Sequence, residues 1–214
     1  MTRKEKIKKR QRSLERKAAR RRQVRARAPH RPAGAQTLLR SAASWPLLEC
    51  LLTKTWQKPG EIVQILVARR SPTGQIAVGS FLVDLACLGV KNAFAHLFGS
   101  AIEYRQLRDG MTRRQTMVPA DLNLVAKIIR EGVRYADSLG FKPDPDYRDA
   151  LLVLGNADPE ACDTPIPLGG EDGQPFFIAG PYDDVGKIMR QLDKAVGPGN
   201  YHFLVPLDMM PPDF

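Results

Sequence analysis

Three residues able to take part in covalent chemistry lie close together in the stretch VDLACLGVK. Asp84 interrupts an apolar run where a strand is expected to become a helix, so its carboxylate is predicted to cap the helix N-terminus. Cys87 then falls in the first helical turn, where the helix dipole favours the thiolate, and Lys91 follows one turn later on the same face. The spacing therefore fits a reactive cysteine with Asp84, Cys87 and Lys91 as its catalytic site.

The same spacing also fits a purely structural role. Free cysteines are among the residues most often buried, so a small thiol in the core is the first interpretation of Cys87. His96 falls about 900° further round the helix, and therefore on its opposite side, at ~3.6 residues per turn. A catalytic Cys–His pair would need His202 or His30 from elsewhere in the chain. We keep a thiol-dependent hydrolase or transferase as the alternative.

A second stretch, GPYDDVGKI, has the outline of a phosphate-binding loop, because glycines and a lysine lead from a predicted strand into a helix. Its two glycines are separated by one residue too many, and Ile188 stands where the motif needs a metal-binding Ser or Thr. Asp183 and Asp184 would also present negative charge to a phosphate. We therefore predict a capped helix start here and no nucleotide cofactor.

Metal and disulfide chemistry are not indicated either. The three Cys and three His residues show no ligand spacing. Asp144, Asp146 and Asp149 lack the glycine and closing glutamate of a calcium loop. Three scattered thiols instead predict free cysteines in a reducing compartment.

The strongest compositional signal is the N-terminal arm, MTRKEKIKKRQRSLERKAARRRQVRARAPHRP. Residues 1–32 contain 15 Lys and Arg residues against two Glu residues, a net charge of +13, whereas the remaining 182 residues carry −3. Such an arm neutralises phosphates and releases their counterions, and arginine-rich segments commonly fold on RNA. Because the arm has no aromatic residue to stack on bases, it is expected to bind the backbone with little sequence preference.

We predict nucleic-acid contacts from the Lys and Arg side chains of this arm: Arg3, Lys4, Lys6, Lys8, Lys9, Arg10, Arg12, Arg16, Lys17, Arg20, Arg21, Arg22, Arg25 and Arg27. Good helix formers with crowded like charges predict an arm that is disordered alone and helical when bound. Two alternatives stay open, a targeting or inert solubilising arm and an arm that docks on an acidic protein surface.

The rest of the chain is interpreted from hydrophobic periodicity. Leucines at one-turn spacing after Pro46 predict a helix through LLECLLTKTW, and LACLGVKNAFAHLFG predicts a second helix. Between them, alternating apolar residues on either side of SPTG predict a β-hairpin over 61–84. A capped apolar stripe predicts a helix from Asp121 to Gly140, and a shorter helix is expected to begin at Asp144.

The chain ends with a predicted strand near 175–180, a helix, and a strand near 200–207, an order that fits a right-handed parallel crossover. The predicted fold class is α+β, a small mixed β-sheet made of the hairpin and these two strands and packed by helices. We predict two parts, a basic arm and linker over 1–35 and a single α+β domain over 36–214.

The predicted function is that of a small nucleic-acid-associated accessory protein, with RNA or a ribonucleoprotein preferred over DNA. The acidic body would add specificity through protein or shape contacts. Besides the thiol enzyme, a non-enzymatic protein-interaction module is a third hypothesis. No apolar run approaches the roughly 18 residues of a spanning helix, and no apolar core follows the basic start, so we expect no membrane partner and a cytoplasmic protein, or a nuclear one in a eukaryote.

Overall fold

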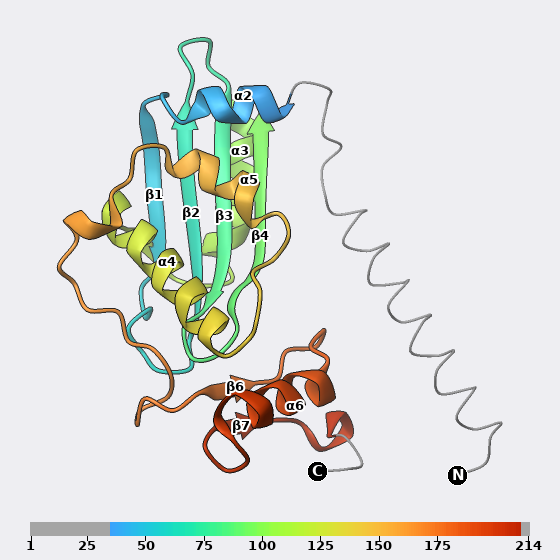
Figure 1. Ribbon diagram of the computed structural model, residues 1–214. Helices are drawn as coiled ribbons and strands as arrows, with labels where there is room; N and C mark the ends of the chain where they lie inside the picture. Colours follow the sequence, from blue (N-terminus) through green and yellow to red (C-terminus); the bar gives the residue numbers. More distant parts are fainter. Residues whose placement is uncertain (1–34, 211–214) are drawn as a thin grey trace. The chain divides into compact units, whose positions relative to one another are not determined.

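The computed structural model describes residues 35–210, which belong to one unit of the chain, Ala33–Phe214 (Figure 1). The basic arm and the binding role predicted for it therefore lie outside the described residues. Within 35–210, no helix combines the length and the apolar character needed to cross a membrane.

A five-stranded antiparallel sheet forms the centre of the described part. Four of its strands follow one another as a meander: β1 (Leu47–Thr53), β2 (Ile62–Arg70), β3 (Ile76–Asp84) and β4 (Gly89–Phe98). The short β5 (Met117–Pro119) pairs with the other side of β1, so the spatial order is β4-β3-β2-β1-β5. The β-hairpin predicted over 61–84 is confirmed as β2 and β3.

The two helices predicted from LLECLLTKTW and LACLGVKNAFAHLFG are wrong, because these segments form β1 and β4. The sheet is covered on both faces, so a strand can be apolar on both sides and lose the alternation that normally reveals it. In β1, neighbouring Leu51 and Leu52 are 9% and 1% exposed and belong to different core clusters. An apolar run of this kind looks like a helix in sequence.

Helices cover both faces of the sheet (Figure 1). On one face lie α2 (Ala35–Ala42), α4 (Leu122–Ser138) and α5 (Tyr147–Leu151), and on the other lies α3 (Ala101–Thr112). The described residues also contain three short 3-10 helices: η1 (Leu152–Leu154), η2 (Pro159–Ala161) and η3 (Leu207–Met209).

The predicted caps of the long helix are confirmed. The carboxylate of Asp121 accepts the backbone N–H groups of Asn123 at 2.8 Å and Leu124 at 3.1 Å, and Gly140 follows the helix with φ +82°. The shorter helix begins at Tyr147, three residues after Asp144, whose carboxylate instead accepts the N–H of Asp146 at 2.9 Å.

The end of the chain forms a separate layer, here called the C-terminal module: β6 (Phe176–Ile178), α6 (Val185–Val196) and β7 (His202–Leu204). The strands β6 and β7 pair in parallel, as the predicted crossover requires. The α+β class is confirmed, although the strands divide between an antiparallel sheet and this parallel pair. Phe177, Met189 and Leu192 form the module's own core with Cys87 and Leu139.

Candidate functional site

The predicted Asp84–Cys87–Lys91 site spans the turn between β3 and β4, where the C-terminal module meets the sheet. Asp84 ends β3, Cys87 lies in the turn and Lys91 belongs to β4. Asp84 Oδ1 accepts the backbone N–H groups of Ala86 at 2.9 Å and Cys87 at 3.0 Å. The predicted carboxylate-to-backbone bonds are therefore present, but they close a turn and do not cap a helix. Since residues 85–88 are not helical, no helix dipole acts on the Cys87 thiol.

Burial makes Cys87 a poor nucleophile. Its side chain is fully buried, and burial raises the pKa of the thiol, with the negative charge of Asp84 adding to the effect. The positive charge of Lys91 lowers the pKa of Cys87, but by less than burial and the charge of Asp84 raise it. Burial likewise raises the pKa of Cys50 to about 12. The reactive-cysteine hypothesis requires a low thiol pKa, and the raised pKa of Cys87 argues against it. The structural interpretation of Cys87 fits the geometry better.

Lys91 has a partner that its sequence spacing does not reveal. Its Nζ lies 2.7 Å from Asp183 Oδ2, and the two side chains are only 16% and 13% exposed. The same oxygen accepts the N–H of Gly180 at 2.8 Å, so Asp183 is held by its own loop as well as by β4. Asp184 accepts the N–H of Lys187 at 3.4 Å, as the predicted helix cap requires.

Asp84, Cys87, Lys91 and Asp183 share their surroundings with Tyr135 of α4, and we call these five residues the junction cluster. Burial raises the pKa of Asp84 to about 6, opposed by the charge of Lys91 and the backbone N–H groups. Burial raises the pKa of Tyr135 to about 12, and its hydroxyl, although buried, has no hydrogen-bond partner among the described residues.

The junction cluster can therefore take up a proton near pH 6 and can hold two parts of the fold together. A substrate has no access to its two reactive groups, because Asp84 is 3% exposed and Cys87 is fully buried. Sequence analysis missed Tyr135 and interpreted Asp183 only as part of a capped helix start. The contact from Lys91 to Asp183 spans 92 residues, and no local pattern signals it.

A close approach of α4 positions this cluster. Gly89 begins β4 with φ +66°, and a Cβ at this position would lie 2.7 Å from Ala136 Cβ. A Cβ on Gly132 would lie 2.8 Å from Val83 Cγ1. The two glycines let the helix backbone reach the β3–β4 turn, which places Tyr135 over it.

A buried arginine elsewhere in the core is fully satisfied by backbone groups. Arg69 is 5% exposed, and its guanidinium donates at 2.7–2.8 Å to the carbonyl oxygens of Trp45, Val153 and Leu154. These bonds tie β2 to η1 and to the chain before β1. Arg69 is therefore a structural cation, since burial without such bonds would be costly.

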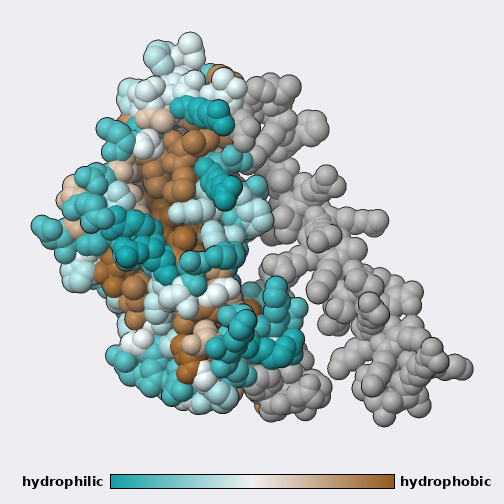
Figure 2. Space-filling view, viewed as in Figure 1, coloured by the Kyte–Doolittle hydropathy of each residue, from teal (hydrophilic) through white to brown (hydrophobic). Residues whose placement is uncertain are grey.

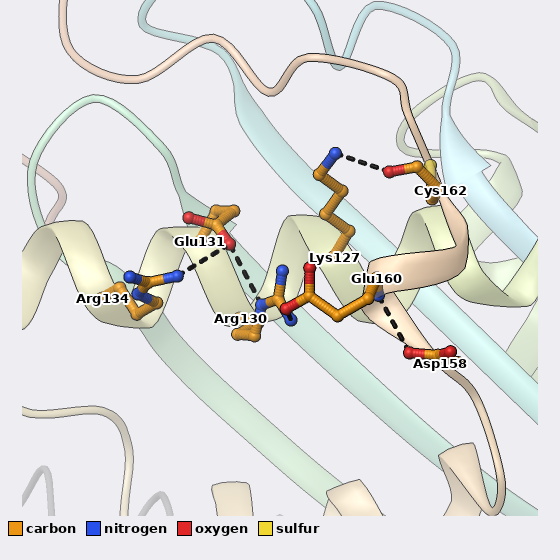
Figure 3. Close-up of polar contacts among 7 residues, drawn as sticks. All are labelled: Lys127, Arg130, Glu131, Arg134, Asp158, Glu160 and Cys162. Atoms are coloured by element: carbon orange, nitrogen blue, oxygen red, sulfur yellow. Dashed lines mark hydrogen bonds and ion pairs between the residues drawn. The ribbon is translucent and has the colours of Figure 1, made fainter.

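Residues 155–175 form an acidic segment, which contains five Asp and Glu residues and no Lys or Arg. Figure 3 shows how α4 holds this segment: Lys127 Nζ donates to the carbonyl oxygen of Cys162 at 2.6 Å, and Arg130 pairs with Glu160. On the face seen in Figure 2, hydrophilic side chains cover α4 and its surroundings, and a hydrophobic strip remains visible between the helices.

Positive charge gathers on the opposite side, at and near α3. We define the α3 basic surface as four exposed side chains, Lys54, Arg105, Arg113 and Arg114. Lys54 is brought to the end of this helix because its backbone N–H donates to Thr116 O at 2.9 Å. None of the four forms an ion pair with another described residue, so their charges face solvent.

A shallow cleft of about 360 Å³ lies on the β6–β7 pair and is lined by Pro59, Gly170, Glu171, Asp172, Phe176 and His202. His202 Nε2 lies 2.8 Å from Asp172 Oδ2, and this hydrogen bond lowers the pKa of Asp172. Within residues 35–210, no three His, Cys, Asp or Glu side chains converge in a way that could hold a metal ion.

Comparison with known proteins found no significant match: no family model, no curated protein and no solved structure matches this chain.

Proposed function

We propose that this protein is a small nucleic-acid-associated accessory protein, anchored on the phosphate backbone by its Lys/Arg-rich arm, residues 1–32. The observation that carries the proposal is the separation of charge along the chain, +13 in the arm and −3 in the other 182 residues. RNA or a ribonucleoprotein is the preferred partner over bare DNA, because arginine-rich segments commonly fold on RNA. The arm anchors, and the acidic body adds specificity through protein or shape contacts.

The affinity of such an arm comes from counterion release. Each phosphate that a Lys or Arg neutralises frees condensed cations, so binding weakens steeply as salt rises. The α3 basic surface supports the same partner class, since its four cations have no ion pair among the described residues. The acidic segment 155–175 would repel a polyanion, so nucleic acid is expected on the α3 side of the described part.

The test is a titration of the full-length chain with labelled single-stranded RNA and duplex DNA over a series of salt concentrations. The informative variant replaces six arm cations by Gln: Lys8, Lys9, Arg10, Arg20, Arg21 and Arg22. Loss of six phosphate contacts lowers the log–log salt slope by about 4 on single strands. Affinity near physiological salt should fall by about a hundredfold or more.

The matched control neutralises exposed cations on one face of α6, Lys187→Gln, Arg190→Gln and Lys194→Gln, and should leave the slope nearly unchanged. A wild-type chain that binds neither nucleic acid near physiological salt contradicts the proposal. The proposal is also contradicted if the variant with six arm substitutions binds as tightly as the wild type. Either result would favour a targeting segment or a protein-docking arm.

We further propose a cytoplasmic location, or a nuclear one if the source is eukaryotic. Free, mostly buried thiols fit a reducing compartment. A thiol-dependent enzyme is not proposed, because burial raises the pKa of Cys87 and closes it to substrate.

A further inference from the structure

The outer edge of β7 is not covered by any strand of residues 35–210. Its neighbour β6 is held on both sides, because Phe176 N–H donates to Ala86 O at 3.0 Å and β7 pairs along the other side. The sheet has only these two strands, so β7 leaves one edge open. Unpaired strand edges are templates for pairing with another chain.

The backbone groups that face this edge can be assigned from the bonds on the inner side. His202 N–H donates to Pro175 O at 2.8 Å, and Leu204 O accepts from Ala179 N–H at 3.0 Å, so both residues bond toward β6. Because bonding direction alternates along a strand, the N–H and C=O of Phe203 point to the open edge. Val205 is the first residue after β7, and extending the strand by this one residue would direct its N–H and C=O to the same edge.

The side chains around this edge are unusually apolar for a surface. Three of the eight exposed large hydrophobic residues within 35–210 lie in β7 or shortly after it: Phe203, Leu204 and Leu207, which are 46%, 63% and 93% exposed. The run from Phe203 to Leu207 contains no charged residue. Natural edge strands are guarded by charges, by shortness or by proline. This edge is short and Pro206 follows it, but no charge guards it.

We propose that β7 pairs with β7 of a second copy of this chain, antiparallel and about a two-fold axis at Leu204, to form a continuous four-stranded sheet. In this register Phe203 and Val205 of the two copies exchange backbone hydrogen bonds. The two Leu204 side chains meet in a non-hydrogen-bonded pair, where cross-strand side chains come closest. Pro206 has no backbone N–H to donate. The interface loses no hydrogen bond from this, because an N–H at position 206 would point toward β6 and away from the second copy.

A second copy fits this edge because pairing about a two-fold axis sets each residue against itself or a close neighbour. Like charges directly opposite one another destabilise a strand pair, and the 203–207 run brings none. Isologous dimers of this kind are the commonest closed oligomers. A dimer also presents two basic arms, which would raise nucleic-acid avidity, and only this last consequence rests on the proposed function.

The first experiment measures the mass of the nuclease-treated full-length chain by light scattering over a range of concentrations. We expect a dimer, and we expect Leu204→Lys to raise its dissociation constant at least about tenfold, a change of about 1.4 kcal/mol. The matched control is Ile102→Lys on α3, since Ile102 is 62% exposed and Leu204 63%. Circular dichroism confirms that both variants fold.

A monomeric wild type at all concentrations overturns the proposal, and so does equal association of the Leu204→Lys and Ile102→Lys variants. If the wild type is a monomer that binds a different protein, and Leu204→Lys abolishes this binding, the β7 edge belongs to that protein. This result also overturns the proposed dimer. Nucleic-acid binding is measured separately, so loss of the dimer and loss of arm binding remain distinguishable.

The second experiment tests the register by crosslinking. Leu204→Cys in a Cys162→Ser background should form a covalent dimer on oxidation with diamide, because its Cβ would face its own counterpart near disulfide distance. Cys50 and Cys87 are buried and do not compete. Ile102→Cys in the same background reports random collision. Equal rates for the two cysteines would overturn the register.

Discussion

β3 and β7 both contain large apolar residues, yet they lie in opposite surroundings. Eight of the nine residues of β3 are buried, whereas all three residues of β7 are exposed. β3 lies between β2 and β4 with helices on both faces of the sheet, and β7 borders solvent. Apolar composition alone therefore does not show the role of a strand. Similar residue types form the core in β3 and an exposed surface in β7.

The junction cluster connects these two regions. Its Lys91 belongs to β4, beside β3, and its Asp183 belongs to the loop that leads into α6. Phe176 N–H also bonds to Ala86 in the β3–β4 turn. Besides these polar contacts, the module has a hydrophobic core of its own that includes Cys87 and Leu139. This core is smaller than that of the five-stranded sheet, so the stability of the module should depend more strongly on single contacts.

The largest expected effect comes from comparing the same type of substitution, Phe to Ala, in each of the two strands separately. Phe81→Ala in β3 removes a fully buried ring and should lower the free energy of unfolding by about 3–5 kcal/mol. Phe203→Ala in β7 removes a ring that is 46% exposed and should cost less than about 1 kcal/mol. Urea unfolding in the monomeric Leu204→Lys background measures both without a contribution from dimerisation. Equal losses would contradict the comparison.

The connection itself is tested by Lys91→Met. Removing one member of a largely buried ion pair leaves Asp183 uncompensated and should cost about 2–3 kcal/mol. Hydrogen exchange should show the loss in the amides of β6, α6 and β7, while β2 and β3 keep their protection.

The control for Lys91→Met is Lys142→Met, since Lys142 pairs with Asp137 on the surface, where the two side chains are 78% and 55% exposed. It should cost less than about 0.5 kcal/mol. Adding Asp183→Asn to Lys91→Met removes the unpaired charge and should recover part of the loss. A loss of protection spread evenly over the whole sheet would show that the module is not a separate unit.

A proton-linked difference is expected at Asp84. Its folded-state pKa of about 6 lies above the ~3.9 of an unfolded chain, so its stabilising contribution is fully present below pH 4 and is lost as pH rises through 6. Asp84→Asn, which keeps the acceptor oxygen but never ionises, should be more stable than the wild type at pH 8 by about 3 kcal/mol, since each pKa unit corresponds to ~1.36 kcal/mol. Near pH 4 the two should be equal. Urea unfolding at both pH values measures this, and a pH-independent difference would contradict it.

The elements that sequence analysis predicted correctly are those defined by local chemistry. The long helix carries its own start and stop signals in Asp121 and Gly140, and the β2–β3 hairpin is marked by its SPTG turn. Asp84 was correctly expected to bond backbone N–H groups just after it, because such bonds are local whatever element follows.

What sequence analysis missed depends on partners that are distant in the chain. β1 and β4 were predicted as helices because both strands direct apolar residues to both faces of the sheet, which hides the alternation that marks a strand. The partner of Lys91 lies 92 residues away, so spacing pointed to Cys87 instead. Sequence analysis also could not predict the open edge of β7, because the exposure of this edge depends on the order of the strands in the folded sheet.

The smallest expected effect is a difference in thiol protection. Cys50 lies within β1 of the main sheet and should react with iodoacetamide only on global unfolding, whereas Cys87 becomes accessible when the C-terminal module opens locally. We expect Cys87 to be alkylated about tenfold faster than Cys50, which corresponds to an opening about 1.4 kcal/mol less costly. Cys162, which is partly exposed, serves as the fast reference.

Lys91→Met should accelerate the alkylation of Cys87 and leave that of Cys50 unchanged, because it loosens only the module. The reactive-cysteine hypothesis requires the opposite, since a lysine that stabilised the thiolate would slow the reaction when removed. Mass spectrometry of peptides over time distinguishes the two. Slower labelling of Cys87 in Lys91→Met would show that Lys91 activates the thiol, and faster labelling would show that it holds the module over it.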